Sequence, residues 1–537
     1  MSLLTAQLYP GRGLGFLRKS ALAIFFLPAN AATRFLANAR IVLGASLHDV
    51  LTRIKAEPQR FPKLEIAYSS DNPVTEPVSV VLPENGIRLR FDGREQRLRL
   101  IEVVDFTKNH VTFKDRDLLK PANGVSAPSS PVPGESSTGP TFRHIYHRVL
   151  GPTYDGEYIP PTGSRDKGTY VLSYPGVAFN FSLAASEYSP NKDVVSLLSA
   201  SSGQAATSMA VFSGDSWADA RPTLWTEVLP SIKSSSVVPR GKDVYPDEIS
   251  LIKLHGGGRI QLFRKWTSNA FWIKLGKTTP QELVMELGPP NAIYRKNDQK
   301  MVIHKMRTTS NARSRPSATD LGRPEDLTDT DHSSMNTGSD DSDHEQAVED
   351  QAALSSTGEC FYNYFYLGFD ILVSTPVPPS SAPPGSEAMA NGSESGVAAY
   401  SPDRLVATKL VLHGNIPGSY EFNRHRRCRW EVEYLNDGTD SEPVNSESDF
   451  KHIEERLHEK WESAYSKNKS QPRQRGMVLN RGWGDSPGSS CEFLGGWEES
   501  GARRAEATGD STTTLYGFPG LVFEVLRNGF VNGVTVF

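Results

Sequence analysis

One short pattern recurs along the chain: a glycine, a serine or threonine two or three positions later, and then apolar residues at helical spacing. Its copies begin at Gly44, Gly139 and Gly276. A hydroxyl side chain at that position accepts hydrogen bonds from the N–H groups that the first turn of a helix leaves unpaired. In the third copy, Thr279 and Glu282 have the spacing of a capping box. Each copy therefore predicts a short capped helix.

A second pattern also recurs: a glycine followed by apolar residues at alternate positions. This period-two pattern after a glycine turn predicts a half-buried strand that belongs to a hairpin. One helix and one hairpin cannot bury their apolar faces alone, so the copies must pack together or extend one another's sheets. We therefore expect an α+β fold, in which repeated helix-plus-β-hairpin units form antiparallel sheets packed with short helices, with long disordered insertions. The four strands begin after Gly86, Gly176, Gly368 and Gly520.

Composition separates folded blocks from linkers. Hydrophobic residues make up 37% of the chain, below the roughly 45–50% of typical globular proteins. We expect a variable segment at 1–42, a first unit at 43–120, a second unit with following strands at 141–306, a third unit formed by 276–306 with 358–435, an amphipathic helix at 444–467 and a C-terminal hairpin at 514–537. Polar, low-complexity stretches predict a linker at 121–140 and disordered loops at 307–357, 374–403 and 468–513.

The amphipathic helix places Phe450, Ile453, Leu457 and Trp461 on one face. This face either packs on the core or docks a partner. Within the acidic loop, Ser339 and Ser342 are candidate phosphorylation sites, because added charge there would alter a docking contact. The alternative is a solvated acidic loop with no such role.

No pattern assembles a catalytic or cofactor site. The net charge of −4 gives no overall basic character for nucleic acid. The three cysteines are widely spaced, which favours buried, inert thiols over a zinc site or a disulfide framework. The run His255–Gly258 is similar to the oxyanion-hole motif of lipases, but no Gly-x-Ser-x-Gly nucleophile motif accompanies it. We therefore expect a hairpin turn there, and a protein that is not an enzyme and uses no cofactor, metal, nucleic acid or small-molecule substrate.

One strongly basic cluster precedes a predicted strand. A basic strand edge with an aromatic residue is suited to an acidic lipid surface or a phosphoinositide head group, although such a cluster is also typical of a solvated face. Strand alternation predicts Arg427 and Arg429 on one side, opposite Arg426, Cys428 and Trp430. The candidate lipid-binding residues are Arg424, Arg426, Arg427, Arg429 and Trp430.

Eight segments together resemble the phagosome assembly factor 1 family, in family order along essentially the whole chain. The resemblance implies a non-catalytic, cytoplasmic adaptor in autophagy that acts with a β-propeller partner and is recruited to phosphoinositide-containing, autophagosome-forming membranes. The alternative is a Golgi or endosomal trafficking factor that binds acidic lipid directly. The family supplies no catalytic residues. The matching segments are 43–51, 85–103, 147–154, 174–177, 275–283, 362–370, 412–418 and 516–520.

The N-terminal segment departs from the family pattern. No acidic residue precedes Asp49, and basic residues flank the apolar run Ala21–Leu27. Such a segment is typical of a targeting peptide, and its apolar run is far short of the roughly 20 residues that span a bilayer. The family pattern runs almost directly from Gly15 to Leu43. Residues 16–42 are therefore a targeting signal, an insertion or a gene-model error.

Overall fold

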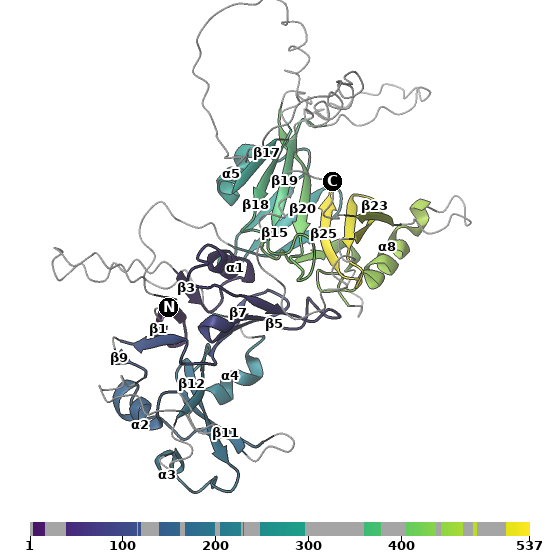
Figure 1. Cartoon of the computed structure of the whole chain (residues 1–537). Coiled ribbons are helices and arrows are strands. Elements are labelled where there is room, and N and C mark those ends of the chain that lie inside the picture. The colour runs from purple at the N-terminus through teal and green to yellow at the C-terminus, as the bar shows by residue number, and fades with distance from the viewer. Residues whose placement is uncertain are drawn as a thin grey trace, which may run out of the picture. The chain divides into compact units, whose positions relative to one another are not determined.

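A computed structural model describes the fold of the chain (Figure 1). Its contacts divide the chain into two compact units. Unit 1 comprises Met1–Ile273, Tyr364–Phe369 and Val411–Phe537, and unit 2 comprises Lys274–Asn363 and Asp370–Leu410. The residues that the structure describes are 4–16, 39–114, 116–119, 139–161, 167–198, 205–226, 229, 248–295, 359–376, 404–436, 442–465, 476–480 and 512–537.

The largest sheet of unit 1 has eight strands, and every neighbouring pair in it is antiparallel. Apolar residues alternate along its strands, so that one face is buried, as along β5 and β6. The strands in spatial order are β10 (Glu157–Ile159), β11 (Lys167–Tyr174), β12 (Val177–Ala184), β13 (Ala206–Val211), β7 (Leu98–Val103), β6 (Ile87–Phe91), β5 (Val78–Leu82) and β4 (Glu65–Ala67).

A smaller, five-stranded sheet of unit 1 includes the N-terminal residues. Here β1 is antiparallel to β2 and parallel to β8. The segment 1–42, expected to be variable, thus contributes three strands, whereas residues 17–38 lie outside the described part. The strands in order are β3 (Ala39–Val42), β2 (Gly13–Phe16), β1 (Leu4–Tyr9), β8 (Asn109–Phe113) and β9 (Arg116–Asp117).

The three capped helices predicted from the sequence are present. Helix α1 (Leu47–Lys55) begins after Ser46, whose hydroxyl accepts the Asp49 N–H. Helix α2 (Phe142–His144) begins after Thr141 and continues as a π-helical turn over Ile145–Val149. In unit 2, α5 (Pro280–Leu287) has the complete capping box of Thr279 and Glu282. Two further helices of unit 1 are α3 (Val194–Leu198) and α4 (Trp217–Thr223).

The four glycine-led strands are also present, as β6, β12, β19 (Phe369–Ser374) and β24 (Leu521–Val525). Gly176, in the turn between β11 and β12, shows why glycine is needed. Its φ is +74°, and a Cβ there would lie 2.0 Å from the backbone nitrogen of Gly11. The α+β fold class is confirmed. That its units are repeats of one another stays a prediction.

The C-terminal part of unit 1 adds two groups of strands and a long helix. The order β16-β15-β14-β21 includes one parallel pair, β14 with β21, and the order β25-β24-β23-β22 is antiparallel. Helix α8 (Phe450–Tyr465) packs on the second group, with Phe450 4.4 Å from Tyr516 between ring centroids and with Ile453 and Leu457 buried (Figure 1). The strands are β14 (Ile249–Leu254), β15 (Arg259–Arg264), β16 (Ala270–Lys274), β21 (Trp430–Val432), β22 (Met477–Asn480), β23 (Thr512–Phe518) and β25 (Val531–Val536).

Unit 2 combines α5 with four strands. Two backbone hydrogen bonds fix the start of the helix to β20, from Gly276 N–H to the Ala407 carbonyl and from Ala407 N–H to the Thr278 carbonyl. Leu283 and Leu287 of α5 are buried. The strands in order are β17 (Ala292–Arg295), β18 (Cys360–Tyr364), β19 and β20 (Val406–His413).

Candidate functional site

The basic cluster chosen from the sequence does not form an exposed strand edge, which corrects that prediction. Strand β21 begins only at Trp430, so strand alternation does not apply to the arginines before it. Arg426 and Arg427 are 9% and 7% exposed, and Trp430 is 2% exposed. Only Arg424 is exposed, and it pairs with Glu421 at 3.6 Å. The lipid-binding role of this cluster thus loses the open surface on which it depended.

Arg426 lies between two carboxylates of unit 1. Its Nη2 donates to Oδ2 of Asp49 in the first turn of α1, and its Nη1 lies 3.1 Å from Oε1 of Glu248, just before β14. Burial alone would raise the pKa of Asp49, but the Arg426 charge and the contacts with His48 and Ser46 together outweigh it, so that the pKa is lowered. The charged form of Asp49 is therefore the stable one, and the loop before β21 is held against α1.

Two more cations extend this network toward the turn between β6 and β7. Arg97 Nη2 lies 2.8 Å from Oε2 of Glu248. Lys265 Nζ lies 2.7 Å from Oε2 of Glu95. Burial raises and the neighbouring cations lower the pKa of both acids, and the lowering prevails. Four segments that are distant in the sequence are thereby joined by charge.

Arg427 and Arg429 complete the network. Arg427 donates three hydrogen bonds to backbone carbonyls, at 2.7 Å to Arg94, 2.8 Å to Gly414 and 3.1 Å to Ser446. Arg429 forms a two-pronged pair with Glu447, at 2.9 and 3.2 Å. The arginines thus bind acceptors inside unit 1. A run of basic residues in the sequence does not show whether its side chains are buried or exposed.

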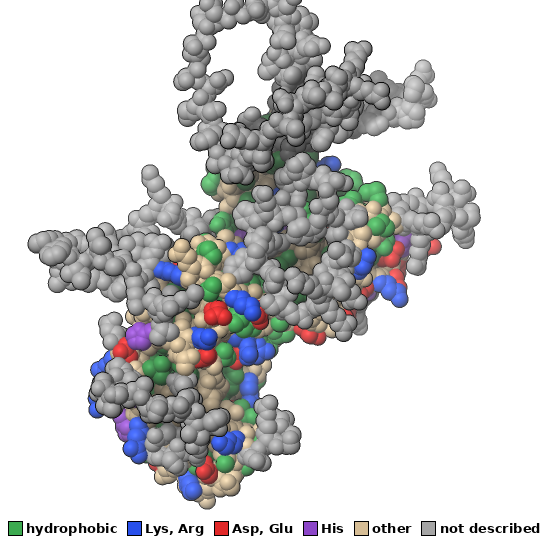
Figure 2. Space-filling model, viewed as in Figure 1, with side chains coloured by type: hydrophobic (Ala, Val, Ile, Leu, Met, Phe, Trp, Pro, Cys, Tyr) green, Lys and Arg blue, Asp and Glu red, His purple; other side chains and the backbone are tan. Residues whose placement is uncertain are grey.

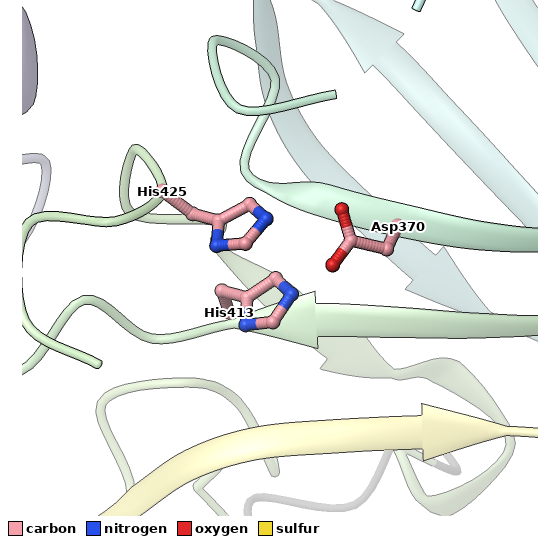
Figure 3. Close-up of side chains that lie close together, drawn as sticks. All are labelled: Asp370, His413 and His425. Atoms are coloured by element: carbon pink, nitrogen blue, oxygen red, sulfur yellow. The ribbon is translucent and has the colours of Figure 1, made fainter. Parts of the chain in front are cut away.

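A stacked histidine pair lies beside this network in unit 1. The ring centroids of His413 and His425 are 3.7 Å apart with the planes at 9° (Figure 3). His413 Nδ1 lies 3.5 Å from Oε2 of Glu421. Figure 3 also labels Asp370, which belongs to unit 2. A zinc site takes three or four protein ligands, and the stacked pair offers two, so we assign no metal to it. Sequence reasoning missed this pair because its members are not close in the sequence.

Two sequence expectations about chemistry can be compared directly with the structure. Burial raises the pKa of the Cys428 thiol to about 12, as expected for an inert cysteine. Residues 255–258 form the turn between β14 and β15, with positive φ at all three glycines. Cys360 is partly buried. Cys491 and the candidate phosphorylation sites Ser339 and Ser342 lie outside the described residues.

Antiparallel sheets, short capped helices and an ion-pair network that joins distant segments of unit 1 characterise the described part of this protein. The chain belongs to the phagosome assembly factor 1 family, whose family model matches residues 38–321 and 400–537. The family name indicates a role in phagosome assembly. No solved structure matches the chain.

Similar proteins occur in plants and animals. A PHAF1 protein of Arabidopsis thaliana is 22% identical over 507 residues, which cover 92% of this chain and 89% of the relative. A PHAF1 protein of Drosophila melanogaster is 22% identical over 516 residues, 92% of this chain and 90% of the relative. One from Caenorhabditis elegans is 28% identical over 141 residues, 26% of this chain and 28% of the relative. Within the described residues, no helix has the length and apolar character needed to cross a membrane.

Proposed function

We propose that this protein is a non-catalytic adaptor in autophagy, which acts with a β-propeller partner at phosphoinositide-containing membranes where autophagosomes form. The observation that carries the proposal is the family match over residues 38–321 and 400–537, to a family named for phagosome assembly. The cluster around Arg426 and Arg427 agrees with an adaptor, because its contacts are ion pairs and carbonyl hydrogen bonds within unit 1. The rival role, trafficking at Golgi or endosomal membranes through the Arg424–Trp430 cluster, loses support from the burial of that cluster.

Exposed apolar side chains on α5 and β17 of unit 2 support a protein partner. Met285 on α5 is 85% exposed, and Ile293 and Tyr294 on β17 are 56% and 54% exposed. Val284 adds to them at 38%. The same helix packs on the core through the buried residues Leu283 and Leu287. The exposed Val284 and Met285 are therefore not part of that packing. Apolar surface of this kind is typical of protein–protein contact sites.

Strand β17 strengthens this interpretation. It stands at the end of the strand order in unit 2 and pairs with β18 through Ala292–Arg295. An end strand offers backbone hydrogen-bonding groups to another chain, and natural proteins usually protect such an edge with charge or proline. Strand β17 carries Ile293 and Tyr294 at its centre and a single charged residue, Arg295, at its end. We therefore propose α5 and β17 as the partner contact.

Affinity purification tests the proposal. The tagged full-length protein is isolated from starved cells and its partners are identified by mass spectrometry. We expect a β-propeller protein with the wild type, and its loss with the double variant Met285→Glu, Tyr294→Glu. The control is Tyr154→Glu, because Tyr154 is 93% exposed in unit 1 and far outside the proposed contact in sequence. Recovery of no propeller protein by the wild type would reject the partner.

A further inference from the structure

A second basic cluster, which the sequence reasoning did not select, lies on the surface of unit 1. It is formed where β8 and β9 meet α2 and its π-helical turn, and we call it the β8–β9–α2 surface. Figure 2 shows basic and histidine side chains over the region where Figure 1 labels β9 and α2. Its members are Lys114, Arg116, Arg143 and Arg148, with His110, His144 and His147.

Three contacts hold these elements together. His144 Nε2 lies 2.8 Å from the backbone carbonyl oxygen of Asp117, and His110 Nε2 lies 2.9 Å from the carboxylate of the same residue. Arg116 donates from Nη1 to the backbone carbonyl of Arg148. The strand turn and the helical turn, which are well separated in sequence, therefore present their cations on a shared surface.

The charge of this surface is not balanced by its own acids. Its described segments, 109–114, 116–117 and 142–149, contain four lysines and arginines and three histidines, against one carboxylate, Asp117. That carboxylate already pairs with His110. Asp115 lies outside the described residues. Arg426 differs from these cations, because it lies between two carboxylates. Lys114, Arg116, Arg143 and Arg148 are all exposed.

The backbone at this surface is also unusual. Residues Ile145–Val149 form a π-helical turn, closed by a hydrogen bond from Leu150 N–H to the Ile145 carbonyl at 3.0 Å. Turns of this kind are rare and frequently occur at functional sites. The turn buries Ile145 and Val149 while it leaves His147 and Arg148 exposed. It therefore anchors to the core and turns its basic residues outward.

We propose that the β8–β9–α2 surface binds the phosphate-bearing head groups of a membrane. Its exposed cations are spread over a strand turn, a short strand and a helical turn, which suits an array of head groups better than a single phosphate. Each basic residue near an anionic bilayer raises membrane partition by about fivefold. The inference rests on the proposed function only because that function places the protein at a membrane. It assigns the membrane contact to unit 1.

Flotation of the purified full-length protein tests the assignment. The vesicles are phosphatidylcholine alone, phosphatidylcholine with phosphatidylserine, and phosphatidylcholine with phosphatidylinositol 3-phosphate. We expect flotation on both anionic compositions, weakened by salt. The variant Lys114→Gln, Arg143→Gln should lower partition by at least about tenfold, because it removes two cations. The matched control is Lys192→Gln, Lys451→Gln, two exposed lysines elsewhere in unit 1, and it should float like the wild type.

Several outcomes would overturn the proposal. These are equal flotation of the wild type and the Lys114, Arg143 variant, flotation on phosphatidylcholine alone, and no flotation at all. Soluble inositol 1,3-bisphosphate or a phosphopeptide that blocks flotation at stoichiometric concentration would point to a discrete phosphate site instead. Circular dichroism verifies that the variants are folded, and Lys114→Ala replaces the double variant if that variant is unfolded.

The Lys114, Arg143 variant should still recover the β-propeller partner in affinity purification. Failure of the membrane assignment and failure of the proposed function therefore give different results.

Discussion

Arg426 and Asp49 lie 377 positions apart in the chain, yet their side chains form an ion pair within unit 1. Their side chains are 11% and 18% exposed, and Glu248 shares the same guanidinium at 3.1 Å. A buried pair is not by itself strongly stabilising, because desolvation offsets the attraction. Removing one partner is costly, however, because it leaves a charge in the interior without its counter-ion.

The variant Arg426→Met should therefore destabilise unit 1 strongly. It leaves Asp49 and Glu248 buried without their shared cation, and we expect a loss of about 3–5 kcal/mol in the free energy of unfolding. Urea denaturation followed by circular dichroism measures this loss. Arg424→Met is the control, because its side chain is 45% exposed, and it should change stability by less than about 0.5 kcal/mol. Equal effects of the two variants would contradict the network.

Stability should fall in acid because of the same network. The pKa values of Asp49, Glu248 and Glu447 are all lowered in the folded protein, since nearby arginines and the other charges and hydrogen bonds around them together outweigh the opposing effect of burial. Their contribution is fully present above the ordinary pKa of a carboxyl group, about 4, and is lost as the pH falls below it. Unfolding free energies measured between neutral pH and about pH 3 test this. Asp49→Asn should make the decline shallower, and an unchanged slope would contradict the role of Asp49.

The thiol of Cys428 should be unreactive in the folded protein. Burial raises its pKa to about 12, so very little thiolate is present near neutral pH. Iodoacetamide labelling followed by mass spectrometry should modify Cys428 only after a denaturant is added. Cys360 is partly buried and serves as the internal comparison. Labelling of native Cys428 at the rate of an exposed cysteine would show that the segment before β21 opens readily.

The capping box of α5 should contribute measurably to unit 2. Thr279 accepts from the Glu282 N–H at 3.3 Å, and Glu282 accepts from the Thr279 N–H at 2.8 Å. We expect Thr279→Ala to destabilise the helix by about 1 kcal/mol. Hydrogen exchange of the α5 amides reports the local change. Met285→Ala on the exposed side of the helix is the control, and protection lost equally in both variants would argue against the cap.

The sequence by itself determined the local elements. A helix start depends on a hydroxyl residue and the few residues after it, and for this reason Ser46, Thr141 and Thr279 were recognisable as caps. A strand that follows a glycine turn depends on neighbours two positions apart, as in β12 after Gly176. These signals lie within one turn or one strand, so folding of the rest of the chain does not alter them.

Only the tertiary structure decided which basic residues face solvent. The run Arg424–Arg429 has the composition of a surface patch. The acids that pair with its buried arginines are Asp49 in α1, Glu248 just before β14, and Glu447. Lys114 and Arg148, in contrast, are not part of a conspicuous run, and folding brings their segments together on the surface. Arg426 and Arg427 are buried because carboxylates and backbone carbonyls from other segments meet them in space. That meeting depends on residues hundreds of positions away, as Arg426 and Asp49 show.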